Sequence, residues 1–241
     1  KTMDMVTQSL EIKMDDEKIF KITPSGVDYA LKCKRCLWLS YKGIKLEAFF
    51  PPIFNAFDLL QKKFLIGQSV KLLSKALPDG RIMTELNGII GSSKLKDNKG
   101  RSFTINGKTD VVIEFNTEPK RYGIIDLKTT KISPAKIENY KLQLESYATI
   151  FQNPNSKTPK FPNIAEIGLY LFEPKEITNI SNNNCNMKFE TLYLKGKRCQ
   201  KELINRITDI IDVYMTKLPP NYNPGCSNCK FVVSLKQEKY V

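Results

Sequence analysis

The chain has 241 residues, 41% of them apolar, and its 38 basic and 25 acidic residues give a formal net charge of +13. A positive charge of this size favours nucleic acid as a partner, although a general enrichment in lysine would give the same count. No histidine occurs, which excludes a Ser-His-Asp triad, histidine-ligated zinc and a histidine general base, so the chemistry must use carboxylates, lysine, tyrosine, cysteine or a metal.

Two helical stretches open the predicted order of elements. Thr23-Pro24 combines an N-cap threonine with a proline at the first helical position, and the helix that it starts should end at Gly43. A second helical stretch covers about residues 53–77, before the turn sequence Pro78-Asp79-Gly80. Strand-like segments follow at residues 81–90, 102–115 and 122–130.

The second half of the chain repeats this alternation. Ser133-Pro134 starts a helix that should reach Phe151, and two strands follow at residues 164–172 and 188–194. The Asn-rich stretch Thr178 to Met187 is predicted as a loop between these strands, and apolar residues at helical spacing predict a last helix around residues 203–214. The order indicates the α/β or α+β class, with a mixed sheet flanked by helices.

The length of the chain and its lack of long apolar runs set the expected organisation. The length suits a single domain, and we expect residues 1–241 to form one. No stretch approaches the ~18 consecutive apolar residues of a membrane helix. We therefore expect a soluble protein of the cytoplasm that has no membrane partner.

Three charged residues on the predicted strands form a candidate active site. Asp110 precedes one β-branched run, and Asp126 and Lys128 follow the next. If the two runs pair as a hairpin about the loop at residues 116–121, Asp110 faces Leu127 or, after a slip of one residue, Asp126. Either register brings two carboxylates within reach of one cation.

Phosphodiester hydrolysis requires these residue types. Carboxylates are suitable ligands for Mg²⁺ or Mn²⁺, and the backbone carbonyl of Leu127 is a further candidate ligand. Lys128 can neutralise the negative charge that develops in the reaction. In the next helix Gln143 and Tyr147 lie four residues apart on one face, although Tyr147 also fits an apolar stripe of core residues.

Three motifs resemble the active site of RecB-type nucleases of the PD-(D/E)XK superfamily, a group that includes the CRISPR-associated adaptation exonucleases. They are Gly107-x-x-Asp110, Asp126-x-Lys128 and Gln143-x-x-x-Tyr147. The resemblance extends from about residue 23 to residue 230 and implies a restriction-endonuclease-like core. It implies that Asp110 and Asp126 are metal ligands, that Lys128 is the catalytic lysine, and that Gln143 and Tyr147 brace the site and contact the DNA backbone.

One position departs from the family's pattern. The family often has a histidine four residues after a glycine in the preceding helix, and here Lys71 stands in that place after Gly67. An ammonium group cannot ligate a metal without losing its proton. Either Gln68 or Glu85 replaces the missing ligand, or the metal has fewer side-chain ligands, or activity is reduced. Glu85 is chemically the better candidate of the two.

Two C-x-x-C pairs lie near opposite ends of the chain, Cys33 with Cys36 and Cys226 with Cys229. Four thiolates in this arrangement suit a structural zinc ion or an iron–sulfur cluster, and a reducing compartment disfavours disulfides. The resemblance implies a [4Fe–4S] cluster, but the family's third tail cysteine is missing, so zinc stays open as the alternative. Either metal would join residues 23–43 and 219–232 into one module.

The predicted function is that of a Mg²⁺- or Mn²⁺-dependent deoxyribonuclease, an exonuclease acting on single-stranded or frayed DNA. The alternative, motivated by Lys71, is a catalytically weak nucleic-acid-binding module that serves as a scaffold in a larger protein complex. A zinc-stapled protein-interaction domain is a third hypothesis, and it leaves the candidate active-site residues without a role.

Overall fold

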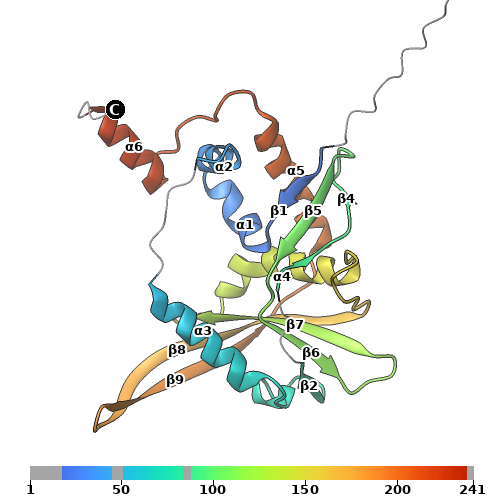
Figure 1. Cartoon of the computed structure of the whole chain (residues 1–241), viewed down its shortest axis with the longest axis vertical. Coiled ribbons are helices and arrows are strands. Elements are labelled where there is room, and N and C mark those ends of the chain that lie inside the picture. Colours follow the sequence, from blue (N-terminus) through green and yellow to red (C-terminus); the bar gives the residue numbers. More distant parts are fainter. Residues whose placement is uncertain (1–17, 45–50, 84–87, 238–241) are drawn as a thin grey trace, which may run out of the picture.

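The computed structural model describes residues 18–44, 51–83 and 88–237 (Figure 1). A five-stranded mixed sheet has the order β2-β6-β7-β8-β9. Strands β7 and β8 run parallel, and the other neighbours in this sheet run antiparallel. Its strands are β2 (Gly80–Ile82), β6 (Val111–Phe115), β7 (Arg121–Thr129), β8 (Ile164–Ser181) and β9 (Asn184–Lys195).

A smaller sheet lies to the upper right in Figure 1 and has β5 at its centre. It consists of β1 (Phe20–Ile22), β3 (Ile90–Gly91), β4 (Leu95–Lys96) and β5 (Ser102–Gly107). The single strand predicted over residues 102–115 is therefore wrong, because β5 and β6 belong to different sheets. The ring of Pro24 packs against Gly107, where an added Cβ would lie 2.7 Å from that ring, and the chain changes sheets directly after this close approach.

Six α-helices are found among the described residues, together with short 3₁₀ turns at 30–32 and 70–72. Helix α4 connects the parallel strands β7 and β8, as a crossover between parallel strands must. The helices are α1 (Pro24–Tyr29), α2 (Lys34–Tyr41), α3 (Pro52–Leu65), α4 (Lys136–Gln152), α5 (Gln200–Met215) and α6 (Ser227–Gln237).

Both predicted N-terminal helices are shorter than expected. Thr23 caps α1 as predicted, but Cys33 takes an extended conformation and separates this helix from α2. The second helix ends at Leu65 instead of continuing to about residue 77. Ile66 leaves the helical conformation there, and Gly67 follows with a φ of +79°, which is unfavourable for other residues.

The strands β8 and β9 form one long hairpin that projects from the lower left of the molecule in Figure 1. The loop predicted between Thr178 and Met187 is wrong, because pairing continues to Ser181 and Asn184. Only Asn182 and Asn183 form the turn, with φ values of 42° and 69°. Asparagine tolerates this left-handed conformation, which tight hairpin turns require.

Alternating side chains of the large sheet divide the apolar core between its two faces. Val112 and Ile124 belong to the cluster that includes α1, α4 and α5. Ile113 and Ile125 belong to a second cluster on the opposite face, with the end of α3 and the 70–77 segment. Asp126 continues the row of Ile124, so the strand itself directs this carboxylate toward α4.

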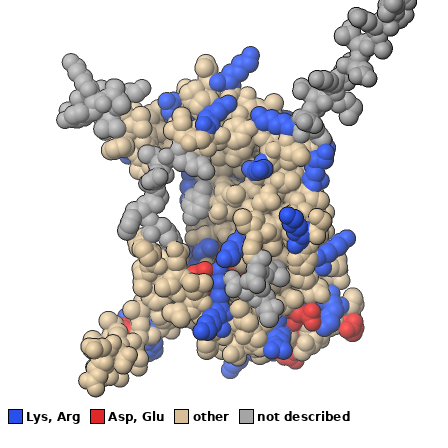
Figure 2. All heavy atoms as spheres, viewed as in Figure 1, with Lys and Arg blue, Asp and Glu red and all other residues tan. Residues whose placement is uncertain are grey.

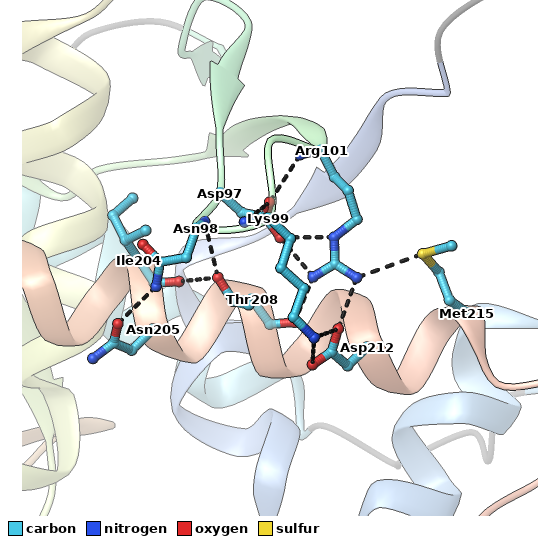
Figure 3. A network of polar contacts seen from close by, with 9 residues as sticks. All are labelled: Asp97, Asn98, Lys99, Arg101, Ile204, Asn205, Thr208, Asp212 and Met215. Carbon is cyan, nitrogen blue, oxygen red and sulfur yellow. Dashed lines mark hydrogen bonds and ion pairs between the residues drawn. The ribbon is translucent and has the colours of Figure 1, made fainter.

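A polar network attaches the turn between β4 and β5 to α5 (Figure 3). The buried carboxylate of Asp97 accepts hydrogen bonds from the backbone N–H groups of Lys99 and Arg101, and Arg101 also forms an ion pair with it at 2.6 Å. Burial alone would raise the pKa of Asp97, but the bonds from Arg101 lower it. Arg101 and Lys99 then reach Asp212 on α5 at 2.7 and 2.8 Å.

Candidate functional site

The two predicted carboxylates meet at the start of β6 and near the end of β7. Val111 pairs with Ile125, so the register continues with Asp110 opposite Asp126. Of the two predicted pairings, Asp110 with Leu127 or Asp110 with Asp126, the second is therefore confirmed. The backbone N–H of Leu127 donates to Asp110 Oδ2 at 2.9 Å, which fixes the carboxylate of Asp110 against the neighbouring strand.

Asp126 is buried and shared by two partners. Its Oδ1 accepts a hydrogen bond from Gln143 Nε2 at 3.0 Å, and its Oδ2 lies 2.5 Å from Lys128 Nζ. Burial raises the pKa of Asp126, the charge of Lys128 lowers it and the nearby carboxylate of Asp110 raises it, with a net pKa of about 7. A positive charge bound beside these two carboxyl groups would stabilise the ionised form of Asp126, which burial and Asp110 disfavour.

Lys128 lies on the same face of β7 as Asp126, as predicted from their two-residue spacing. Burial would lower the pKa of Lys128, but the adjacent Asp126 raises it, so the ammonium group stays charged. The ammonium group also lies 5.2 Å from the centre of the Tyr140 ring, a favourable cation–π distance.

Gln143 and Tyr147 face this site from α4. Gln143 Nε2 lies 3.4 Å from the hydroxyl of Tyr147, and that hydroxyl donates to the carbonyl of Lys108 at 2.7 Å. Tyr147 is also a buried member of the core, so both interpretations of it from the sequence apply. Through Lys108, it fixes the segment that leads into Asp110.

Lys62 is the residue of this site that the sequence analysis missed. From α3 its ammonium group lies 2.8 Å from Asp110 Oδ1 and 2.8 Å from Asp58 Oδ2. Burial would lower the pKa of Lys62, but Asp110 and Asp58 raise it. The spacing Asp58-x-x-x-Lys62 places both residues on one helix face, and this was the signal in the sequence that could have revealed them.

The contacts of Lys71 lie away from this site, among residues 75–79. Its ammonium group donates to the carbonyls of Leu77 and Lys75 and lies 3.4 Å from Asp79. The cause is the early end of α3, which leaves Lys71 on a separate 3₁₀ turn. The candidate ligand Glu85 lies outside the described residues.

A cleft of about 440 Å³ opens between α3, α4 and the end of β7. Asp58 and Gln61 of α3 line one side, and Tyr140 and Gln143 of α4 line the other, with Lys128 between them. Gln61 Nε2 donates to Thr129 Oγ1 at 2.9 Å and attaches α3 to the end of β7. The cleft gives a ligand access to Lys128 and to the carboxylates behind it.

The donor set of this site fits a hard divalent cation. Mg²⁺ and Mn²⁺ prefer oxygen ligands, and Mg²⁺ is commonly held by one or two carboxylates together with substrate phosphate oxygens. Asp110 and Asp126 provide such carboxylates, and the carbonyl of Leu127 lies between Asp126 and Lys128 in the strand. The raised pKa of Asp126 is the observation that supports this fit.

The four predicted cysteines also come together. Sγ of Cys33 lies 3.6 Å from that of Cys229, Sγ of Cys36 lies 3.6 Å from that of Cys226, and all four sulfur atoms lie within 4.8 Å of one another. Burial raises the pKa of Cys33 and Cys36, whereas the backbone N–H of Cys229 lowers the pKa of Cys226 to about 7. Four sulfur atoms this close can hold a metal.

Hydrogen bonds between the N-terminal residues 32–38 and the C-terminal segment support this cysteine site. Arg35 donates to the carbonyl of Pro220 at 3.1 Å, and the indole N–H of Trp38 donates to the carbonyl of Thr216 at 3.0 Å. Asn223 Nδ2 donates to the carbonyl of Lys32 at 2.8 Å. These bonds hold the extended segment that brings the second cysteine pair to the first.

The charge excess of the chain is visible on its surface. Figure 2 shows many Lys and Arg side chains across one face and few Asp and Glu side chains. Within the described part of the chain, none of the helices has the length and apolar character that a membrane crossing requires.

Comparisons with known proteins assign the family. The sequence model of the PD-(D/E)XK nuclease superfamily matches residues 55–233, a range that includes the carboxylate site and the second cysteine pair. No curated protein matches the chain. Among solved structures, the chain is similar to the crystal structure of SSO0001, with a TM-score of 0.48 and 15% sequence identity. The match covers 91% of this chain and 88% of that chain. Because the superfamily match spans well over half of the chain, the protein belongs to the PD-(D/E)XK nuclease superfamily.

Proposed function

We propose that the protein is a divalent-metal-dependent deoxyribonuclease whose active site contains Asp110, Asp126 and Lys128. The observation that carries the proposal is the buried carboxyl group of Asp126, shared by Lys128 and Gln143 and placed beside Asp110. Members of this superfamily are usually metal-dependent nucleases. The proposal treats residues 1–241 as one nuclease domain.

Each residue has a defined part in this chemistry. A bound divalent ion would supply Lewis-acid activation of the phosphodiester and of water. Asp110 and Asp126, with the carbonyl of Leu127, would hold that ion. Lys128 places a positive charge at the cleft, where it stabilises negative charge developing on the phosphoryl oxygens. Gln143 fixes the orientation of Asp126 and is a positioning residue.

Tyr147 is a second positioning residue. Its hydroxyl holds the carbonyl of Lys108, two residues before Asp110, and it contacts Gln143 at the same time. Tyr147 therefore contacts both the segment that leads into Asp110 and the side chain of Gln143, which binds Asp126. We also propose that Gln143 and Tyr147 contact the DNA backbone.

The substrate that we propose is the end of a DNA strand, single-stranded or frayed, which makes the enzyme an exonuclease. The cleft of about 440 Å³ lies within the ~300–1,000 Å³ range of small-ligand sites, so a strand end fits it better than an intact duplex. Phe54 and Tyr140 line the cleft, and aromatic rings of this kind can stack on bases. The net charge of +13 favours the polyanion.

A nucleic-acid-binding module with weak catalysis is the second candidate. The observation that favours it is the ion pair between Lys62 and Asp110, which already places a cation on a proposed metal ligand. Such a module would act as a scaffold in a larger protein complex.

End-labelled DNA separates the two candidates. We expect the purified protein to shorten labelled single strands with Mg²⁺ or Mn²⁺, and Asp126→Asn to slow this shortening strongly without unfolding the protein. Asp209→Asn removes an exposed carboxylate from α5 and is the matched control, expected to behave as wild type. Binding of DNA without turnover at any metal concentration would favour the scaffold instead.

For the cysteine site, we infer a single tetrahedrally coordinated ion, and zinc is the one that suits four thiolates best. A zinc ion with bonds of ~2.3 Å to sulfur sets the four sulfur atoms about 3.8 Å apart. The observed contacts of 3.6 Å are close to that spacing. In a [4Fe–4S] cluster each thiolate binds a different iron, which spreads the sulfur atoms farther apart.

Metal analysis of anaerobically purified protein tests the zinc assignment. We expect stoichiometric zinc, colourless protein, and loss of the zinc in Cys229→Ser but not in Cys185→Ser, which changes an exposed cysteine outside the cluster. Iron, sulfide and the visible absorption of a cluster would instead support the [4Fe–4S] assignment. Both assignments keep residues 23–43 and 219–232 as one module and require the reduced thiols of a cytoplasm.

A further inference from the structure

A buried lysine beside the proposed metal ligands has no part in the chemistry described above. Lys62 is only 5% exposed, and its ammonium group lies 2.8 Å from both Asp110 Oδ1 and Asp58 Oδ2. Lysine is almost never fully buried unless it is paired, and two carboxylates share this one. Its position next to Asp110 gives it a direct influence on any ion bound there.

Both oxygens of Asp110 contact protein groups. Oδ1 forms the ion pair with Lys62, and Oδ2 accepts the hydrogen bond from the N–H of Leu127. A metal ion that approaches Asp110 therefore meets an ammonium group already bound to it. The cation and the metal must share this carboxylate, or one must withdraw.

Asp58 gives Lys62 a place to withdraw to. It lies one helical turn before Lys62 on α3, its carboxylate already contacts the ammonium group, and its side chain is 42% exposed. Lys62 can keep this partner when a metal binds Asp110, so its charge would not be left buried without compensation.

The charges of the site show what Lys62 does to metal binding. Asp58, Asp110 and Asp126 are acidic and Lys62 and Lys128 are basic, so the fully ionised group carries a net charge of −1. Without Lys62 the same group would carry −2. Each unit of charge this close to a divalent ion changes its binding energy strongly, because burial limits screening by water and salt.

We propose that Lys62 is an internal counter-ion that competes with the divalent metal for Asp110 and, with Asp58 as its alternative partner, sets the metal affinity of the site. The inference rests on the proposed function, since it takes Asp110 and Asp126 as the metal ligands. Lys62 thus adjusts the metal affinity of the site, whereas Lys128 faces the cleft.

Titration of the full chain with Mn²⁺, followed by the paramagnetic resonance signal of the free ion, tests the proposal without any need for turnover. Lys62→Gln should bind Mn²⁺ about tenfold more tightly or better, because removal of one neighbouring positive charge relieves repulsion. Asp58→Asn should bind it more weakly, because Lys62 then has only Asp110 as a partner. A purely structural role would not move the two variants in opposite directions.

Lys63→Gln is the charge-matched control, since it removes the same charge from the next residue of α3, where the side chain is exposed. We expect its affinity to change less than about twofold, because water and salt screen an exposed charge. Affinity of Lys62→Gln equal to or weaker than that of wild type would overturn the proposal. If Lys62→Gln does not fold, Asp58→Asn decides, and unchanged or tighter binding there would contradict it.

Mn²⁺ titration of Asp126→Asn distinguishes failure of this proposal from failure of the proposed function. Mn²⁺ binding that depends on Asp126 defines the site, in wild type or in Lys62→Gln. If neither protein binds Mn²⁺ in this way, the nuclease proposal itself fails, and the role of Lys62 fails with it. If wild type binds and Lys62→Gln binds no better, only the role of Lys62 is wrong.

Discussion

The carboxylate site and the cysteine site are built in opposite ways. The first uses a hairpin and the helix after it, so strand register and hydrogen bonds to Gln143 and Leu127 position its side chains. The second joins cysteines 190 and 196 residues apart, through a tail that few hydrogen bonds attach. The folded backbone therefore preorganises the first site, whereas the second should depend on its metal for cohesion.

The largest expected effect is confined to the carboxylate site. Asp126→Asn should lower the rate of DNA cleavage on the order of 10²–10³-fold or more, because it removes a proposed metal ligand and its charge. The content of the zinc proposed for the cysteine site should stay the same. Cleavage rate and zinc content measured on one preparation check this, and loss of zinc would contradict the independence of the two sites.

The next effect is confined to the tail. Cys226→Ser should speed tryptic cleavage after the exposed Lys217 by about tenfold or more, because the tail loses its metal constraint. Cys185→Ser should digest as wild type does. Digestion followed by mass spectrometry shows which bond opens, and equal rates in the two variants would mean that the hydrogen bonds to Arg35 and Trp38 suffice.

The pH dependence of stability gives a third test, on metal-free protein. Asp126 has a folded-state pKa of about 7 against 3.8 for an ordinary aspartate, since burial raises it. Its contribution is therefore fully present below about pH 4 and is lost as the pH rises to about 7, by up to about 1.4 kcal/mol per pH unit. Denaturant unfolding at several pH values should show this loss in wild type and a flatter curve in Asp126→Asn.

The smallest expected effect concerns the support of Asp126. Gln143→Leu leaves Oδ1 of Asp126 buried without its donor, and the free energy of unfolding should fall by about 1–3 kcal/mol. Gln152→Leu, at the end of the same helix and partly exposed, removes solvent-accessible hydrogen bonds to Arg198 and to the carbonyl of Pro162 and should cost less. Denaturant unfolding of both variants at one pH gives the comparison, and a larger loss in Gln152→Leu would contradict it.

The sequence predicted the parts of the carboxylate site that depend on local spacing. The two-residue spacing of Asp126 and Lys128 and the four-residue spacing of Gln143 and Tyr147 determine which side chains share a face. The hairpin register was predictable only to within one residue, because loop length alone does not distinguish the two pairings. The cysteine pairs were predictable from their spacing, although the distances between their sulfur atoms were not.

The errors come from tertiary contacts and backbone conformations that no periodicity reports. Lys62 was missed because lysine in an amphipathic helix is normally solvent-exposed, and one of the two carboxylates that pair with it when buried, Asp110, is distant in sequence. The helix break at Gly67 depends on a left-handed conformation. The turn at Asn182 and Asn183 was hidden in a polar stretch whose composition predicts a loop.

The close approach of Pro24 to Gly107 makes the catalytic geometry a joint property of both sheets. Asp110 follows Gly107 by three residues and begins the passage into the large sheet, whereas its partner Asp126 belongs to the large sheet alone. The distance between the carboxylates of Asp110 and Asp126 thus depends on how the two sheets pack against each other. Local opening of the smaller sheet would abolish the proposed nuclease activity while most of the secondary structure persisted, so activity should be lost before the fold is.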